Sequence, residues 1–251
     1  TKHLHLARAE TALNRGDADA AGRAAAAALA WDSDSALAHV ALARAAITRG
    51  ENQAAMAHLD AAITLLPAHP YAHLLRGDLL RLQGAAEAAR QDLAYETSAL
   101  EDLQTWAWQR MISPPPSQLN LGDGLDLGFI RGFHQLAAGE DGFRWSREHA
   151  EVRLHATAGT QQIEIQAASG RPDGSATPLR VSLNGQVVGE VMVSAAGDTY
   201  RLKLPNPIST PDAVVIQLES PTFHPRDYDR TSADGRRLGV QIAALRISPA
   251  P

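Results

Sequence analysis

The chain contains no cysteine among its 251 residues. Disulfides, thiolate metal sites and cysteine nucleophiles are therefore excluded. Aromatic residues make up only 5% of the chain, and no apolar run approaches the roughly 20 residues that a helix needs to cross a membrane. A basic excess is also absent, because residues 1–118 carry 10 basic and 13 acidic side chains and the remainder carries 13 and 15. Nucleic acid is therefore not an expected partner.

The sequence motifs of common catalytic sites are absent as well. No G-x-x-x-x-G-K-[ST] phosphate loop, H-E-x-x-H zinc helix or G-x-S-x-G nucleophile elbow occurs. Glu140 and Asp141 are adjacent carboxylates in an expected loop, whereas a glycosidase needs two carboxyl groups that face each other across a sugar. Such a pair can come from distant strands, so a cryptic glycoside hydrolase stays an alternative. No catalytic residue is assigned, and we expect a protein that is not an enzyme.

Three glycines mark an internal repeat in the alanine-rich first hundred residues. Gly16, Gly50 and Gly84 are each 34 residues apart. Small residues recur at the same interval where two helices must cross closely: Ala9, Ala43 and Gly77. A 34-residue period of this kind is typical of tetratricopeptide (TPR) repeats, in which each repeat is a pair of antiparallel helices. The glycines fit the turn between the two helices, which requires a positive φ.

The sequence therefore predicts an α-solenoid of three TPR repeats, at about 2–35, 36–69 and 70–103. A capping helix from Ser98 to Met111 is expected to cover the apolar end of the stack. The first helix of each repeat is expected to line a concave groove, with these candidate residues: Glu10, Asn14, Arg44, Thr48, Tyr71 and Asp78. Since leucine and valine occupy other groove positions, we expect an apolar or extended segment of a protein partner. The alternative is that the helical stack serves only as a spacer or docking surface.

A proline-rich segment separates two kinds of periodicity. Residues 113–117 (SPPPS) cannot continue a helix and favour a stiff, extended connector. After it, apolar and polar residues alternate with a period of two, which predicts half-buried strands. Asn184-Gly185 lies between two such runs and predicts a two-residue hairpin. The last run has one irregularity in its spacing: Val240, Ile242, Leu245 and Ile247.

We therefore expect a multidomain α + all-β protein. A helical-repeat domain is predicted at 1–112, a linker at 113–121, and an antiparallel β-sandwich of jelly-roll type at 122–251. No signal peptide is visible and the sequence does not begin with methionine. We expect a processed chain or a soluble part of a longer protein, with any membrane segment elsewhere in that parent.

The richest polar stretch runs from Phe223 to Arg237, before the last predicted strand. Arginine and carboxylate groups hold sugar hydroxyls through paired hydrogen bonds, and an aromatic ring can stack on the sugar face. The candidate glycan-binding residues are Trp145, Phe223, His224, Arg226, Asp227, Tyr228 and Arg230. Candidate calcium ligands are Asp227, Asp229 and Asp234, although the stretch departs from the EF-hand pattern. The alternative for the polar stretch is a loop held by internal Arg–Asp pairs. The alternative for Trp145 is a side chain that packs in the core.

Four short segments of the second half carry a resemblance to known proteins. They are residues 125–134 (LDLGFIRGFH), 143–146 (FRWS), 220–227 (SPTFHPRD) and 237–240 (RLGV). With them the chain resembles the TPR-plus-β-sandwich tails of large bacterial membrane proteins, including ones similar to polyprenyl-phosphate-sugar glycosyltransferases. Its sandwich also resembles galactose-binding and carbohydrate-binding-module jelly rolls.

The resemblance implies a non-catalytic, scaffolding part of a bacterial cell-envelope protein on the extracytoplasmic side of a membrane. The repeats would dock a protein, and the sandwich would contact glycan or lipid-linked sugar. A module for protein–protein assembly alone is the alternative. No cofactor is expected, and calcium is the one alternative.

Overall fold

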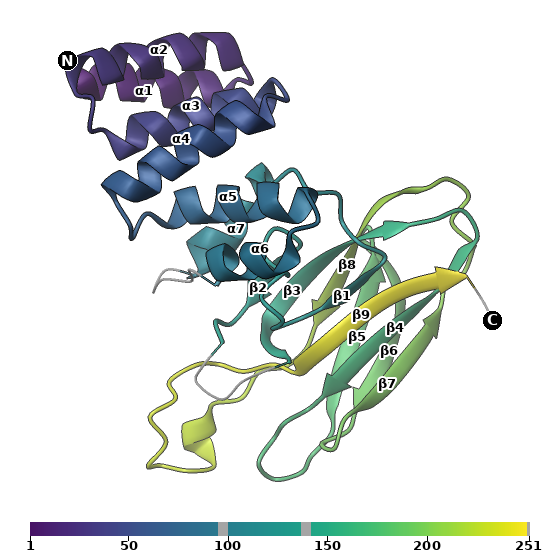
Figure 1. Ribbon diagram of the computed structural model, residues 1–251. Coiled ribbons are helices and arrows are strands. Elements are labelled where there is room, and N and C mark those ends of the chain that lie inside the picture. The colour runs from purple at the N-terminus through teal and green to yellow at the C-terminus, as the bar shows by residue number, and fades with distance from the viewer. Residues whose placement is uncertain (95–99, 137–141, 250–251) are drawn as a thin grey trace. The chain divides into compact units, whose positions relative to one another are not determined.

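The computed structural model describes residues 1–94, 100–136 and 142–249. The chain divides into two compact units, residues 1–97 and 98–251, and each is described by itself (Figure 1). In the described residues, no helix is both long enough and apolar enough to span a bilayer.

The first unit consists of three helix pairs with a constant period. The helices are α1 (Lys2–Asn14), α2 (Ala18–Trp31), α3 (Ala36–Thr48), α4 (Asn52–Leu65), α5 (Pro70–Leu82) and α6 (Ala86–Leu93). The first helices of the pairs begin at residues 2, 36 and 70, and the second helices begin at 18, 52 and 86. Both series advance by 34 residues, so the predicted helix pairs are confirmed. Gly16, Gly50 and Gly84 have φ between +74° and +79° in the turns, as the turn requires.

The helix expected to cap the repeats belongs to the second unit. This helix is α7 (Leu100–Arg110), and its buried Gln104 pairs with the edge strand β2 (Ile130–Phe133). The amide of Gln104 donates to the carbonyl oxygen of Phe133 (3.3 Å) and accepts from the N–H of Phe133 (3.2 Å). Arg153 stacks over the Trp108 ring at 4.0 Å from its centroid. The prediction that this helix caps the repeats is therefore wrong, because a helical period alone does not reveal which unit buries a helix.

The second unit is a sandwich of two antiparallel sheets. One sheet has the order β2-β3-β8-β5-β6, where β3 is Arg144–Ala156, β8 is Asp212–Glu219, β5 is Thr177–Leu183 and β6 is Gln186–Val193. The other, here called the β9 sheet, has the order β1-β9-β4-β7, where β1 is Gln118–Asn120, β9 is Gln241–Pro249, β4 is Thr160–Ala168 and β7 is Asp198–Lys203. The start of β3 also pairs with β9, so this strand joins the two sheets.

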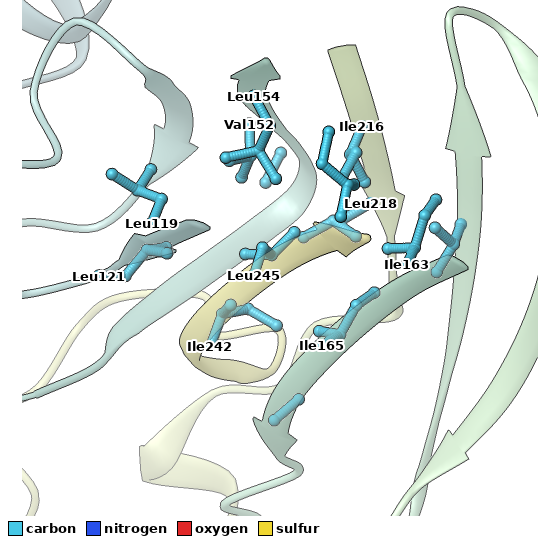
Figure 2. Close-up of a cluster of buried hydrophobic side chains, with 14 of the residues drawn as sticks. Leu119, Leu121, Val152, Leu154, Ile163, Ile165, Ile216, Leu218, Ile242 and Leu245 are labelled. Carbon is cyan, nitrogen blue, oxygen red and sulfur yellow. The ribbon is translucent and has the colours of Figure 1, made fainter. Parts of the chain in front are cut away.

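The core lies between the sheets and is built from the alternating residues of the strands. Figure 2 shows part of it, with Val152 and Leu154 of β3, Ile163 and Ile165 of β4, Ile216 and Leu218 of β8, and Ile242 and Leu245 of β9. Burying each such side chain contributes about 1.5–3 kcal/mol. The alternation predicted from the sequence is therefore confirmed. Asn184 and Gly185, with φ of +48° and +84°, join β5 to β6 as the predicted hairpin turn.

The irregular spacing in the last strand is a β-bulge. Gln166 pairs with Ala244 and Ala167 pairs with Ile242, so Ala243 is the extra residue on β9. A bulge shifts the phase of a strand by one residue. Ile242 and Leu245 can therefore both face the core, although they are three residues apart.

The segment expected to be a linker is part of the sandwich. Residues 118–120 form β1 on β9, within the predicted linker at 113–121. The carbonyl oxygen of Pro116 accepts from the N–H of His155 (2.9 Å), and that of Ser117 accepts from the N–H of Ile247 (3.0 Å). Proline lacks an N–H group but keeps its carbonyl acceptor. The proline-rich segment is thus hydrogen-bonded to two strands and does not act as a free connector.

Candidate functional site

The outer face of the β9 sheet carries a hollow of about 440 Å³. Several of its lining residues are small: Ala168, Ala196, Gly197 and Ala243. The longer side chains that line it are Phe143, Gln166, Asp198, Thr199 and Gln241. Small residues beside longer ones on one face of a sheet leave space above the small ones. The bulge contributes directly, since Ala243 is both the extra residue of β9 and part of the lining.

Strand register brings these distant residues together. Gln166 of β4 pairs with Thr199 of β7 on one side and with Ala244 of β9 on the other. Ala168 pairs with Gln241 at the start of β9. The hollow therefore lies where three strands end or begin, and no two of those strands are adjacent in the sequence.

The polar groups of the hollow can recognise hydroxyl groups. Amides both donate and accept hydrogen bonds, a carboxylate accepts, and a threonine hydroxyl does both. Within the described part of the chain, the side-chain amides of Gln166 and Gln241 take part in no hydrogen bond. One oxygen of Asp198 accepts from the N–H of Thr199 (2.6 Å). The ring of Phe143 adds an apolar wall to this polar set.

Two structural features involve neighbours of the residues that line the hollow. The hydroxyl of Tyr200 accepts from the N–H of Ser194 (2.7 Å) and donates to its Oγ (3.3 Å), which closes the turn before β7. Gly170 allows Trp145 and Gln241 to pack closely, because a Cβ there would lie 2.4 Å from the Trp145 ring and 2.9 Å from the Gln241 amide carbon. The orientation of Gln241 thus depends on a glycine outside the hollow.

A buried ion pair anchors the start of β3 beside the hollow. Arg144 follows Phe143 directly, and its Nε and Nη2 donate to the two carboxylate oxygens of Asp126 at 2.5 and 2.9 Å. Both side chains are at most 1% exposed. The Asp126 carboxylate also accepts from the N–H of Gly122 (2.8 Å).

A second hollow of about 210 Å³ continues the first along the same face. Gln166 and Thr199 line both. The second also has a row of longer polar side chains: Gln118 of β1, Arg246 of β9, Glu164 of β4 and Arg201 of β7. Arg201 Nε lies 3.8 Å from Glu164 Oε1. Together the two hollows make a polar path across four strands, here called the β9-sheet groove.

Sequence reasoning missed the residues of this groove. The outward positions of alternating strands are normally polar, so Gln166, Thr199 and Gln241 looked like ordinary surface residues. The available signal was the run of small residues at Ala243-Ala244 and Ala196-Gly197, together with the irregular spacing of β9. That signal acquires meaning only when the register is known.

The predicted glycan site is only partly assembled. Trp145 and Phe223 are each 7% exposed, and they pack with Leu238 in a small cluster with ring centroids 5.7 Å apart. Neither ring offers a face to a sugar, and packing explains both. Tyr228 is 40% exposed and lies edge-on to Phe223 at 5.7 Å. It is the one exposed ring of the predicted set.

The other predicted residues lie in the loop between β8 and β9, which contains a short 3-10 helix, Pro225–Asp227 (Figure 1). Arg226, Asp227 and Arg230 are exposed and His224 is half-buried. Arg226 Nε donates to the carbonyl oxygen of Ser232 (3.2 Å). This loop is therefore held in part by its own hydrogen bonds, and none of these four residues lines either hollow of the β9 sheet.

The three predicted calcium ligands do not converge. Asp229 accepts from the hydroxyl (2.6 Å) and the N–H (2.8 Å) of Thr231, and these bonds lower the pKa of its carboxyl group. Asp234 is paired with Arg236 at 2.7 Å, which lowers the pKa of its carboxyl group as well. Among the residues that the structure describes, no three acidic, histidine or cysteine side chains form a metal-binding group. The internal Arg–Asp pairing considered from the sequence is present instead.

The predicted groove residues of the first unit differ in their surroundings. Glu10 and Arg44 form an ion pair of 2.6 Å between α1 and α3, while Asn14 and Thr48 are exposed. Tyr71 is half-buried, with its ring 6.0 Å from that of His69. Asp78 is 1% exposed and accepts from Arg81 at 2.6 Å. Because Asp78 is buried and paired, it is not an accessible contact for a partner, in contrast to the expectation.

The opposite sheet also carries carboxylates. Glu148, Glu190 and Glu219 line a hollow of about 270 Å³ with Arg180. Arg180 lies 3.8 Å from Glu190 and 4.0 Å from Glu219. Glu140 and Asp141, considered from the sequence, lie outside the described residues.

Comparison with known proteins gives matches among solved structures alone. No protein-family model matches the chain, and no curated protein sequence matches it. A family 36 carbohydrate-binding module in complex with calcium and xylotriose is 16% identical, covering 52% of this chain and 98% of that one, with a TM-score of 0.33. A family 35 module from Clostridium thermocellum is 13% identical, covering 53% and 99%, with a TM-score of 0.33.

An acetyl xylan esterase from Butyrivibrio proteoclasticus is 10% identical, covering 55% of this chain and 34% of the esterase, with a TM-score of 0.34. At these identities and TM-scores the likenesses assign no function to the chain.

Proposed function

We propose that the second unit binds a glycan chain in the β9-sheet groove and catalyses no reaction. The observation that carries this proposal is the groove itself, where side-chain amides, a carboxylate and a hydroxyl line a hollow with an aromatic wall. Carbohydrates present hydroxyl groups that donate and accept, together with apolar C–H faces. That combination requires mixed donors and acceptors beside an aromatic surface.

The length of the groove favours an oligosaccharide over a single sugar. The two hollows, of about 440 and 210 Å³, share Gln166 and Thr199 and cross all four strands of the sheet. A single ring would fill only one of them. Polar residues dominate the second hollow, so a peptide that binds through apolar anchors has little to contact there.

The first unit is proposed to dock a protein partner through its TPR-type repeats. One observation favours this role. Trp31 is 68% exposed and Leu65 is 39% exposed, and these residues stand at the same position of successive repeats (65 − 31 = 34). Leu37 and Leu66 are 57% and 47% exposed. Exposed apolar residues at repeated positions are typical of contact surfaces. We place the whole chain in a bacterial cell-envelope protein, on the extracytoplasmic side.

A glycan array tests the proposal with the full chain. We expect specific binding that is lost in a Gln166→Ala/Gln241→Ala variant, because that variant removes the two amides of the main hollow. The matched control is Arg226→Ala/Asp227→Ala in the exposed loop, which should bind as the parent does. Parallel arrays with calcium and with EDTA report whether the metal contributes.

Two outcomes would contradict the proposal. Loss of glycan binding in the Arg226→Ala/Asp227→Ala variant alone would place the glycan site in the loop near Tyr228. No binding by a folded chain to any glycan would favour the assembly role. Circular dichroism and a melting curve for each variant show whether it is folded.

A further inference from the structure

Each repeat of the first unit places a histidine on its first helix opposite one position of its second helix. In the second repeat these residues are His39 of α3 and His58 of α4, with 3.2 Å between their Nδ1 atoms and 5.4 Å between the ring centroids. One repeat later the equivalent residues are His73 and Asp92, with 2.8 Å between Nδ1 and Oδ1. One repeat earlier, His5 stands opposite Ala24 by the same 34-residue shift.

Both residues of the third-repeat pair form further hydrogen bonds within the first unit. His73 Nε2 contacts the carbonyl oxygen of Pro67 (2.8 Å), and Asp92 accepts from Arg76 Nε and Nη2, each at 2.7 Å. Each ring nitrogen of His73 thus already lies within hydrogen-bond distance of an oxygen of the fold.

The second-repeat pair has a different chemistry. Two neutral imidazoles can share one proton between their Nδ1 atoms, so one donates and the other accepts. Both rings are half-buried, and this burial lowers the pKa of His39 and of His58. A lower pKa favours the neutral form of both imidazoles. Neutral imidazole is the form that binds metal ions.

We propose that His39 and His58 form a two-histidine site for a divalent transition-metal ion such as Zn²⁺ or Ni²⁺, which links α3 to α4. Two imidazole nitrogens at about 2.0–2.1 Å from a tetrahedral ion are about 3.3 Å apart. The 3.2 Å between the Nδ1 atoms already matches this separation. Binding thus requires the shared proton to move, by exchange with water, from Nδ1 to Nε2 of the ring that carries it, and a small rotation of the rings, without movement of the helices.

Water completes the coordination of the ion. In residues 1–94 no third acidic, histidine or cysteine side chain joins the pair. A site with two protein ligands binds more weakly than a closed structural site with four. It still stabilises the native state, because the unfolded chain does not hold the two imidazoles together.

Metal titration of the full chain tests the site. The protein is first freed of metal with a chelator and then titrated with ZnCl₂ or NiCl₂ by calorimetry, with melting curves in parallel. We expect one ion per chain and a melting temperature of the first unit that rises with metal concentration. His39→Gln and His58→Gln should each lower the affinity by at least about tenfold, since loss of a mere supporting group already costs 10–100-fold.

Two further variants separate this site from other histidines. His5→Gln, at the equivalent position of the first repeat, should leave the titration unchanged. Ala24→His gives the first repeat the same pair as the second and should raise the stoichiometry from one to two. Unchanged affinity in both His39→Gln and His58→Gln, or absence of binding by the folded parent, would overturn the proposal.

Discussion

Replacing Arg144 by methionine leaves the Asp126 carboxylate buried without its cation. The pair is at most 1% exposed and its two hydrogen bonds measure 2.5 and 2.9 Å. Removing one partner of such a pair costs about 3–5 kcal/mol, because the remaining charge has no compensation. A domain is stable by only about 5–15 kcal/mol. Arg144→Met should therefore lower the melting temperature of the second unit by about 6–20 °C.

The double variant Asp126→Leu/Arg144→Met gives the sharper comparison. It removes both charges, so the penalty for an isolated ion disappears. The lost contacts to the N–H of Gly122 and the carbonyl oxygen of His134 still cost about 1–3 kcal/mol each. The double variant should thus be more stable than the sum of the two single variants implies.

Urea unfolding followed by tryptophan fluorescence measures these free energies. A Trp31→Phe background removes the one tryptophan of the first unit, and the other three lie in the second. Two results would refute the reasoning: a cost below about 1 kcal/mol for Arg144→Met, or single-variant effects that simply add in the double variant.

Three other perturbations have defined outcomes. Gly77→Ala should destabilise the first unit by about 1–2 kcal/mol in urea unfolding, because the new Cβ would lie 2.8 Å from Leu93 Cγ. The free-energy cost of this overpacking exceeds the gain in helix propensity. A Leu93→Ala background should remove the effect. Lowering the pH from 7.5 to 5.5 should reduce the melting temperature of the first unit. Burial lowers the pKa of His69, whose Nδ1 accepts the hydrogen bond that caps α5, so the unfolded state takes up the proton first below about pH 6.5; a His69→Asn variant with an undiminished pH slope would contradict this. Gly170→Ala should reduce both the stability of the second unit and its glycan binding, since the new Cβ would collide with the Trp145 ring. Unchanged glycan binding would show that Gly170 does not influence the groove.

The helical repeats could be predicted from the sequence because their contacts are local. Gly16, Gly50 and Gly84 fix the turns, and the helices then begin 34 residues apart without reference to the rest of the chain. The strands and the Asn184-Gly185 hairpin could be predicted equally well, since a period of two and a turn dipeptide are local signals as well.

What the sequence could not show depends on long-range pairing. Helix α7 continues the helical character of the first unit, yet its Gln104 bonds to a strand nearly thirty residues later. Residues 118–120 become a strand only because β9 lies beside them, more than a hundred residues further along the chain. Asp78 was expected in an open groove, but the fold buries it beside Arg81.

The candidate site shows the same limit. Gln166 and Gln241 approach each other through the register of β4 and β9 and through a bulge at Ala243. The polar loop after Phe223 is predicted as a site from the sequence because its charged residues are close together along the chain. Phe143 and Gln241, which line the same hollow, are 98 positions apart along the chain (241 − 143), so no short window of the sequence contains the groove residues together.

Hydrogen–deuterium exchange on the full chain, with and without the glycan that binds best on the array, is the most direct test of glycan binding in the β9-sheet groove. We expect slower exchange on binding in three segments that line the groove: residues 160–168, 196–203 and 241–249. Protection confined to residues 223–237, or to the first unit, would contradict it.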